Sequence, residues 1–227
     1  DINNRLIANS DDPNHTSLYL LLIFYFCHKR KYYLFSILFI ILGILTLSRN
    51  FLLTIIVFYA INLLIKQNLF KKIISKISFF GGMIFFNVLL IIFSIIFVFA
   101  IARNRQFGDH NNRLINLVDY SNYNRFAVNL FAINELTIDF EKFLNGYGED
   151  YIDKANMYQN RAVHNSLIDL MMQYGVIYSI LNILFINMLI NRKSDNIKYY
   201  FSYTFFSLFL PGLLSGPYLI ALLIILS

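Results

Sequence analysis

The chain has 227 residues, of which 58% are hydrophobic and only 14% are charged. A soluble domain usually carries about a quarter charged residues, so the composition is that of an integral membrane protein. The net charge of +6 is not a nucleic-acid signal, because the basic residues lie at the ends of apolar segments and between them, as membrane orientation requires. The single cysteine, Cys27, excludes an internal disulfide. The chain starts with Asp1 and ends inside an apolar run, so we expect one membrane domain over residues 1–227 that is a fragment of a longer protein.

Apolar segments recur along the chain, and a segment of about 20 apolar residues can cross a bilayer. They predict six membrane helices, over residues 14–27, 32–47, 51–65, 79–102, 166–190 and 199–226. The last segment contains Pro211-Gly212 and Gly216-Pro217, so it is either one kinked helix or two short ones. The predicted fold class is an all-α integral membrane protein, a polytopic helical bundle.

Basic residues divide the connecting segments into two sets. Segments around residues 29–31, 66–76 and 192–198 hold ten basic residues and one acid, and the positive-inside rule places them in the cytoplasm. The remaining connections hold nine basic and twelve acidic residues, counting Asp169 at the start of the segment 166–190. We therefore expect residues 103–165 to form an extracytoplasmic loop of about 60 residues, a length that is usually functional.

This loop has one stretch with helical periodicity. Residues 123–143 place apolar side chains on one helical face, at Phe126, Leu130, Ile133 and Leu136 or Thr137. The sequence Asn145-Gly146-Tyr147-Gly148 then breaks the helix, and it is not a dinucleotide-binding fingerprint. Acidic residues at 11–12 and 149–153 could bind a divalent ion, but a solvated acidic loop is the favoured interpretation, and no metal or cofactor is expected.

The loop ends at His164 and Asn165, where polar sequence meets the apolar segment 166–190. Asn165 or Ser166 is predicted to cap the helix that follows, and Asp169 in its first turn suits the positive end of the helix dipole. His164 is thus expected at the water interface, close to oriented backbone N–H groups. A histidine there can take a proton from an incoming hydroxyl; the alternative is a surface histidine beside a helix cap.

A transferase on the outer face has no ATP and needs an activated donor, such as a lipid-linked sugar diphosphate. Guanidinium groups suit the departing diphosphate because they bind phosphate oxygens in a bidentate manner. Arg49 lies between two apolar runs, where a charge is a functional candidate, although an arginine that reaches to the interface is the alternative. Arg125 begins the amphipathic stretch and could instead be a solvated loop residue. Arg161 and the other loop arginines are weaker candidates.

Four short motifs, taken in chain order, resemble those of the O-antigen ligase/polymerase superfamily of bacterial membrane glycosyltransferases. Asp12-Pro13-Asn14 is similar to the family's acidic-Pro-Asn at an outer helix start, and Ser48-Arg49 to its Ser-Arg at the end of a helical hairpin. Arg125 followed by Gly146-Tyr147-Gly148 is similar to the family's loop arginine and Gly-x-Gly. His164 to Gly175, HNSLIDLMMQYG, resembles its His-Asn helix, which carries leucines and then a glycine.

The resemblance implies a GT-C-like fold in the bacterial cytoplasmic membrane and a metal-independent, inverting glycosyl transfer without a cofactor. It implies that Arg49 and Arg125 hold the diphosphate of an undecaprenyl-diphosphate-linked donor and that His164 is the general base. Supporting roles would fall to Arg161, Asn165 and Asp169. The expected partners are lipid-linked donor and acceptor glycans, the bilayer, a chain-length regulator and a flippase, and no nucleic acid.

The acceptor decides between the activities of this superfamily. A short outer loop favours a polymerase of repeat units for O-antigen, capsule or exopolysaccharide over a ligase that transfers the glycan to lipid A core or protein. A polytopic glycan transporter or flippase is the second alternative. Transporters carry ionisable residues at the bilayer midplane and paired broken helices, whereas the charges of this sequence cluster at the expected outer interface.

Overall fold

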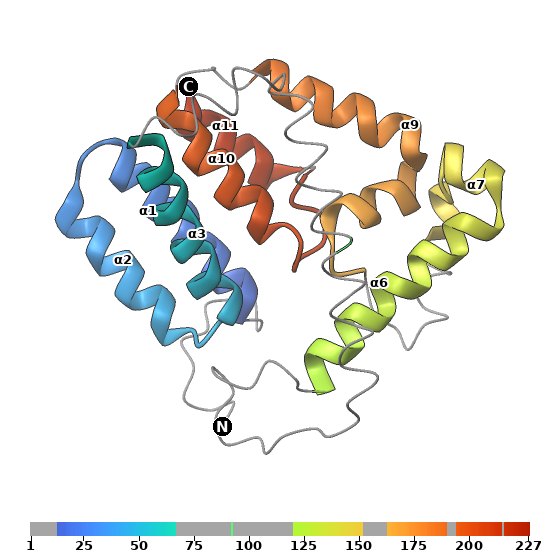
Figure 1. The fold of residues 1–227 in the computed structure, drawn as a ribbon, viewed down its shortest axis with the longest axis horizontal. Coiled ribbons are helices and arrows are strands. Elements are labelled where there is room, and N and C mark those ends of the chain that lie inside the picture. Colours follow the sequence, from blue (N-terminus) through green and yellow to red (C-terminus); the bar gives the residue numbers. More distant parts are fainter. Residues whose placement is uncertain (1–12, 67–91, 93–119, 152–162, 190–193, 215) are drawn as a thin grey trace. The chain divides into compact units, whose positions relative to one another are not determined.

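The computed structural model describes residues 13–66, 92, 120–151, 163–189, 194–214 and 216–227, and within them the regular elements are all helical (Figure 1). The predicted all-α class is therefore confirmed, whereas the polytopic, GT-C-like arrangement stays a prediction. The chain divides into two compact units. Residues 1–71, 190–206 and 217–227 form the first unit, and residues 72–189 and 207–216 form the second. Most of the predicted span 79–102, and Arg161, lie outside the described residues.

The first unit contains the helices α1 (Pro13–Lys29), α2 (Tyr33–Leu45), α3 (Arg49–Lys66), α10 (Ser194–Phe206) and α11 (Pro217–Leu226). The first three match the predicted segments 14–27, 32–47 and 51–65 within three residues at each end. Tight turns join them, with Lys31 at φ 62° and Leu47 at φ 52° in the left-handed region. The ring of Phe51 on α3 packs directly on Gly43 of α2, where an added Cβ would lie 2.1 Å from a ring carbon. A glycine at this position lets the two helices approach closely.

Polar contacts define the two ends of the first unit. At one end Ser48 Oγ donates to Asn14 Oδ1 over 3.0 Å. At the other end Lys198 Nζ donates to Asn62 Oδ1 over 3.1 Å, and Lys29 Nζ donates to the Ile225 carbonyl over 2.6 Å. Two basic residues from segments that were assigned to the cytoplasm, Lys29 and Lys198, are thus bound within the first unit, while residues 67–76 lie outside the described residues.

The predicted segment 199–226 forms two short helices rather than one kinked helix. Near the start of α11, Tyr218 contacts Tyr19 of α1, with 3.2 Å between the hydroxyl oxygens. Near its end, the Leu226 carbonyl accepts from Asn196 Nδ2 at the start of α10 over 2.9 Å, so α11 runs antiparallel to α10. The helices have 13 and 10 residues, or about 20 and 15 Å at 1.5 Å per residue. Each is shorter than the hydrocarbon core of about 30 Å.

Two of the described helical segments, Arg49–Lys66 and Ser166–Ile186, are long and apolar enough to cross a membrane. Large apolar side chains on α2 are also exposed, and Leu34 reaches 80%. The interior of the first unit is aromatic, with the rings of Phe24 and Phe58 edge to face at 5.2 Å between centroids. An aromatic interior with an apolar outer face on α2 is what a lipid environment favours.

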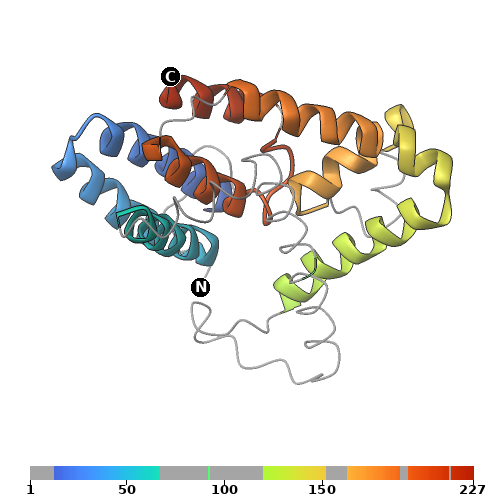
Figure 2. The same cartoon turned by 45° about the horizontal axis from the view of Figure 1, so that its top comes forward.

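The second unit contains α6 (Tyr120–Ile138), α7 (Phe140–Asn145), the 3₁₀ turn η3 (Gly148–Asp150) and α9 (Ser166–Leu189). α9 is bent at Gly175, whose φ of 80° and ψ of 172° are not helical, and both views show its two legs at an angle (Figures 1 and 2). The predicted segment 166–190 is thus present as α9, with a bend that was not predicted. The first leg, residues 166–174, is only about 14 Å long at 1.5 Å per residue.

The predicted helix over 123–143 is also divided in two. Asp139 interrupts it, because its Oδ1 accepts from the backbone N–H groups of Glu141 and Lys142 and caps α7. The buried face of α6 carries Val128, Ala132 and Leu136, whereas the predicted Leu130 and Ile133 are only half-buried and Thr137 is exposed. α7 then ends at Asn145, where the sequence Asn145-Gly146-Tyr147-Gly148 was predicted to break the helix.

Candidate functional site

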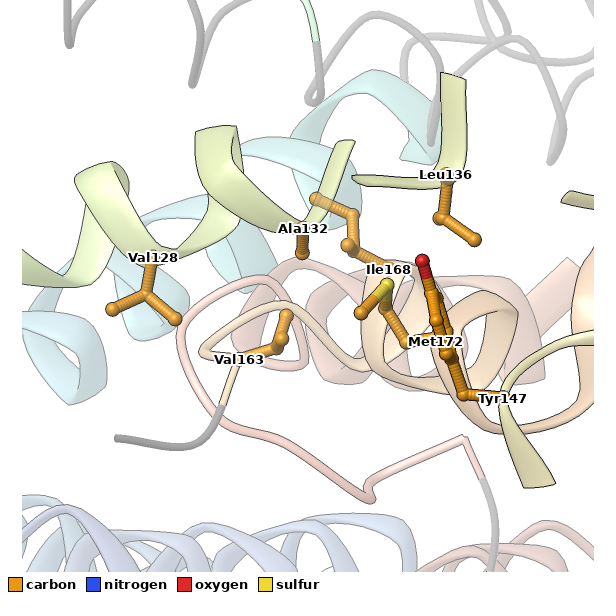
Figure 3. Close-up of a cluster of buried hydrophobic side chains, with 7 residues drawn as sticks. All are labelled: Val128, Ala132, Leu136, Tyr147, Val163, Ile168 and Met172. Carbon is orange, nitrogen blue, oxygen red and sulfur yellow. The ribbon is translucent and has the colours of Figure 1, made fainter. Parts of the chain in front are cut away.

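A hydrophobic cluster holds α6 against the first leg of α9 (Figure 3). Side chains of α6 point toward α9, and the ring of Tyr147 stands beside Met172 (Figure 3). The buried members are Val128, Ala132, Leu136, Tyr147, Val163, Ile168 and Met172. Because Val163 belongs to this cluster, the residue that follows it, His164, is held just before the start of α9.

His164 is half-buried and its backbone is fixed by α6. The His164 N–H donates to Asn129 Oδ1 over 2.9 Å. Arg125, also half-buried, lies four residues before Asn129 on the same helix, and residues at this spacing share a helix face about 6 Å apart. The structure therefore brings the helix face of Arg125 to the backbone of His164. The sequence had predicted Arg125 as a diphosphate ligand and His164 as the general base.

Asn165 is the N-cap of α9, which confirms one of the two predicted caps. Its Oδ1 accepts from the N–H groups of Leu167 over 2.9 Å and Ile168 over 3.2 Å. The residue is fully buried. Among the residues that the structure describes, nothing accepts a hydrogen bond from its Nδ2, and a buried donor in this state costs about 1–3 kcal/mol.

Ser166 binds the irregular segment 207–216 instead of capping α9. Its N–H donates to the Ser207 carbonyl over 2.9 Å, and its Oγ donates to the Leu210 carbonyl over 2.6 Å. The same Oγ accepts from the Leu213 N–H over 2.9 Å. Buried backbone outside a helix needs such partners, so one serine side chain and its backbone hold this segment along the first turn of α9.

Asp169 lies in the first turn of α9, as predicted, and it is buried and bridges three segments rather than facing water. Its Oδ2 accepts from the Gly212 N–H over 3.1 Å. Its Oδ1 accepts from Gln173 Nε2 over 3.1 Å and from the Tyr151 hydroxyl. Burial, and then the neighbouring Asp169 carboxylate, raise the pKa of the Tyr151 phenol, so Tyr151 remains a protonated donor at neutral pH.

Replacing Tyr151 by phenylalanine should lower the free energy of unfolding by about 1–3 kcal/mol, because the Asp169 carboxylate loses a hydrogen bond and stays buried. Thermal or chemical denaturation of the purified protein in detergent measures the change. Tyr174→Phe is the matched control, since Tyr174 is exposed on the same helix and should change stability little. Equal stability of Tyr151→Phe and the wild type would mean that this bond contributes nothing.

Two glycines bring the end of α7 against the bend in α9. A Cβ on Gly175 would lie 2.0 Å from the Leu144 carbonyl oxygen, and a Cβ on Gly146 would lie 2.5 Å from the Gln173 carbonyl oxygen. The Tyr147 N–H donates to the Met172 carbonyl over 2.7 Å at the same place. Gly146 and Gly175 thus take part in one backbone contact. It lies at the end of the first leg of α9, and His164 lies just before the start of this leg.

Arg49 is the first residue of α3 and is half-buried, and it belongs to the first unit. Its neighbour Ser48 is buried, and Ser48 Oγ accepts from the Phe51 N–H over 3.4 Å near the start of the helix. Arg125 and His164 belong to the second unit. The convergence of Arg49 with these two residues therefore stays a prediction.

The sequence interpretation missed three residues that shape this site. Asn129 fixes the backbone of His164, Tyr151 donates to Asp169, and Gly212 does so through its backbone. The position of Asn129, four residues after Arg125, was a usable signal because it puts both on one helix face. Nothing in the local sequence around Tyr151 or Gly212 distinguishes them, since both act through contacts distant along the chain.

Comparison of the chain with protein families, with characterised proteins and with solved structures gave no match in any of the three. The family resemblance is thus carried by residues of this sequence alone.

Proposed function

We propose that the chain is a membrane glycosyltransferase that joins undecaprenyl-diphosphate-linked oligosaccharide repeat units on the outer face of the bacterial cytoplasmic membrane. The observation that carries the proposal is the bond from the His164 backbone to Asn129, one helical turn from Arg125. A general base and a guanidinium on contacting elements are two groups that transfer from a diphosphate donor needs. The products would be O-antigen, capsule or exopolysaccharide.

In this proposal the reaction is one displacement at the anomeric carbon. His164 takes the proton from an acceptor hydroxyl, whose oxygen forms the new bond to the sugar from the face opposite the diphosphate. The bond from the anomeric carbon to the diphosphate oxygen breaks, and its electron pair leaves with the diphosphate. Arg125 and Arg49 compensate the charge that develops there. One displacement inverts the configuration and needs one base, unlike the carboxylate pair of a retaining glycosidase.

A glycan transporter is a second candidate, and one feature of the second unit favours it. α9 is interrupted at Gly175, and residues 207–214 run in irregular conformation beside its first turn. Broken helices that surround a central site are typical of secondary transporters. A ligase that transfers the glycan to lipid A core or protein differs from a polymerase only in its acceptor.

Glycan length profiling separates these candidates. A strain that lacks the full-length protein should carry a single repeat unit on its surface acceptor if the protein is a polymerase. Long polymer that stays on the lipid carrier would identify a ligase, and repeat units that stay in the inner leaflet would identify a transporter. Purified full-length protein in vesicles, supplied with lipid-linked repeat units only, should form polymer without a flippase or a chain-length regulator.

Arg49→Lys should reduce polymer formation by about tenfold or more, because lysine keeps the charge and loses the two-pronged donor geometry that fits a diphosphate. The assay is polymer yield per protein in the same vesicles. Arg30→Lys is the matched control, since Arg30 is exposed near the end of α1 that carries Lys29 and should leave the yield unchanged. A wild-type yield with lysine at position 49 would argue against diphosphate binding there.

A further inference from the structure

The side-chain amide of Asn165 carries more hydrogen-bonding capacity than helix capping uses. Its Oδ1 accepts from two N–H groups of α9, so the amide cannot be turned around without opposing donors to donors. Nδ2 is therefore fixed as the atom that points away from the α9 N–H groups. It is buried, and no acceptor for it exists in the described part of the chain. Aspartate or serine would cap the helix as well as asparagine does, so capping alone does not account for the amide.

The surroundings of this donor are suited to an anion. Nδ2 lies at the N-terminus of α9, where the helix dipole is positive, next to His164, whose backbone is bound to the Arg125 face of α6. Asp169 is in the same helical turn, but its oxygens accept from Tyr151, Gln173 and Gly212, which compensate its charge. The first-turn N–H groups are already bonded to Ser207 and to Asn165 itself. Asn165 Nδ2 is thus a donor at the start of α9 that takes part in none of these hydrogen bonds.

A second buried amide in the same unit has the same property. Asn124, one residue before Arg125 on α6, is buried, and within the described ranges its Nδ2 also has no acceptor. Each of these amides therefore has a buried Nδ2 donor for which the described part of the chain supplies no acceptor. A ligand rich in acceptor oxygens would satisfy them, and a phosphate group is such a ligand.

We propose that Asn165 Nδ2 donates to a phosphate oxygen of the ligand bound beside His164. The inference rests on the proposed function, in which that oxygen belongs to the diphosphate of the lipid-linked donor. Asn165 then has two roles: it ends the loop by capping α9, and it positions the leaving group relative to the base. Free pyrophosphate has the same chemistry and is the alternative source of the oxygen.

The test uses the purified full-length protein in lipid nanodiscs and isothermal titration with farnesyl diphosphate and with inorganic pyrophosphate. Asn165→Asp and Asn165→Ser both keep an oxygen that caps α9 and both remove the amide donor. We expect each to weaken binding of farnesyl diphosphate by about tenfold or more, since hydrogen bonds to charged groups are among the strong ones. Asp139→Asn, which adds an amide at the exposed cap of α7, should bind as the wild type does.

Each outcome distinguishes the two proposals. Wild-type affinity in both Asn165 variants overturns the role of the amide and leaves the proposed function standing. Binding of pyrophosphate but not of farnesyl diphosphate, with the same loss in both variants, supports the amide as an anion donor and overturns the lipid-linked substrate. No binding of either probe to the wild type overturns both proposals.

Discussion

Gly175→Ala should strongly destabilise the second unit. The φ of 80° and ψ of 172° at Gly175 belong to a region that is almost restricted to glycine and costs other residues about 1–3 kcal/mol. The new Cβ would also lie 2.0 Å from the Leu144 carbonyl oxygen and 2.6 Å from the Asn145 nitrogen. These atoms are backbone and cannot rotate away. We expect a loss of at least about 3 kcal/mol, the range in which a marginal fold fails.

The measurement is the unfolding midpoint in detergent, followed by size-exclusion chromatography of the membrane extract. Gly146→Ala should behave similarly, because its Cβ would meet Gln173 and Gly175 at 2.5 Å. Gly148→Ala is the matched control. Gly148 has φ 56° but no atom within 4 Å of an added Cβ, so only the left-handed conformation contributes, about 1–2 kcal/mol. Equal stability of the Gly148 and Gly175 variants would show that the contact between the loop and α9 does not hold.

Helix positions were predictable from the sequence because they depend on local patterns. Long apolar runs placed α1, α2 and α3 within three residues at each end, and the asparagine before a run of apolar residues indicated the cap of α9. The same reasoning found the end of α7 at Gly146, where φ is 75°. These features need no knowledge of what a residue touches elsewhere in the chain.

The bend in α9 was not predictable, because it is set by tertiary contacts, whereas Pro211-Gly212 and Gly216-Pro217 had indicated the interruption between α10 and α11. A glycine within an apolar helix is compatible with a straight helix, and only the approach of Leu144 and Asn145 explains the bend at Gly175. The division of α6 from α7 at Asp139 was missed for a different reason. The hydrophobic pattern runs across the boundary, while the aspartate competes for the backbone N–H groups.

The bonds of Asn129 and Asn165 fix the chain around His164 between α6 and α9. Asn129 ties the His164 N–H to α6, and Asn165 ties the next residue to α9. His164 is therefore held from both sides through its backbone, while its side chain is only half-buried. A catalytic group needs this combination of a fixed position and an open side chain.

His164→Ala should reduce glycan polymerisation by about a hundredfold to ten-thousandfold, the usual contribution of a general base. The measurement is the initial rate of polymer formation in vesicles, with the amount of folded protein in the membrane determined in parallel. His15→Ala is the control, because His15 is a histidine of the first unit whose ring lies 6.4 Å from that of Tyr218 and it has no part in the proposed reaction. A normal rate in His164→Ala at equal protein level would exclude the base role.

Substitutions of Asn129 test whether the rate of the proposed reaction depends on the position of His164 and not only on its presence. Asn129→Leu removes the acceptor of the His164 N–H and should lower the maximal rate by about tenfold or more, since small displacements of a catalytic group cost up to about a hundredfold. Asn129→Asp keeps an acceptor oxygen, and Arg125 one turn away offsets its charge, so it should recover most of the rate. A purely structural role would lower the amount of folded protein in both variants and leave the rate per folded molecule unchanged. Rescue by aspartate together with failure of leucine would therefore assign Asn129 as the residue that positions the base.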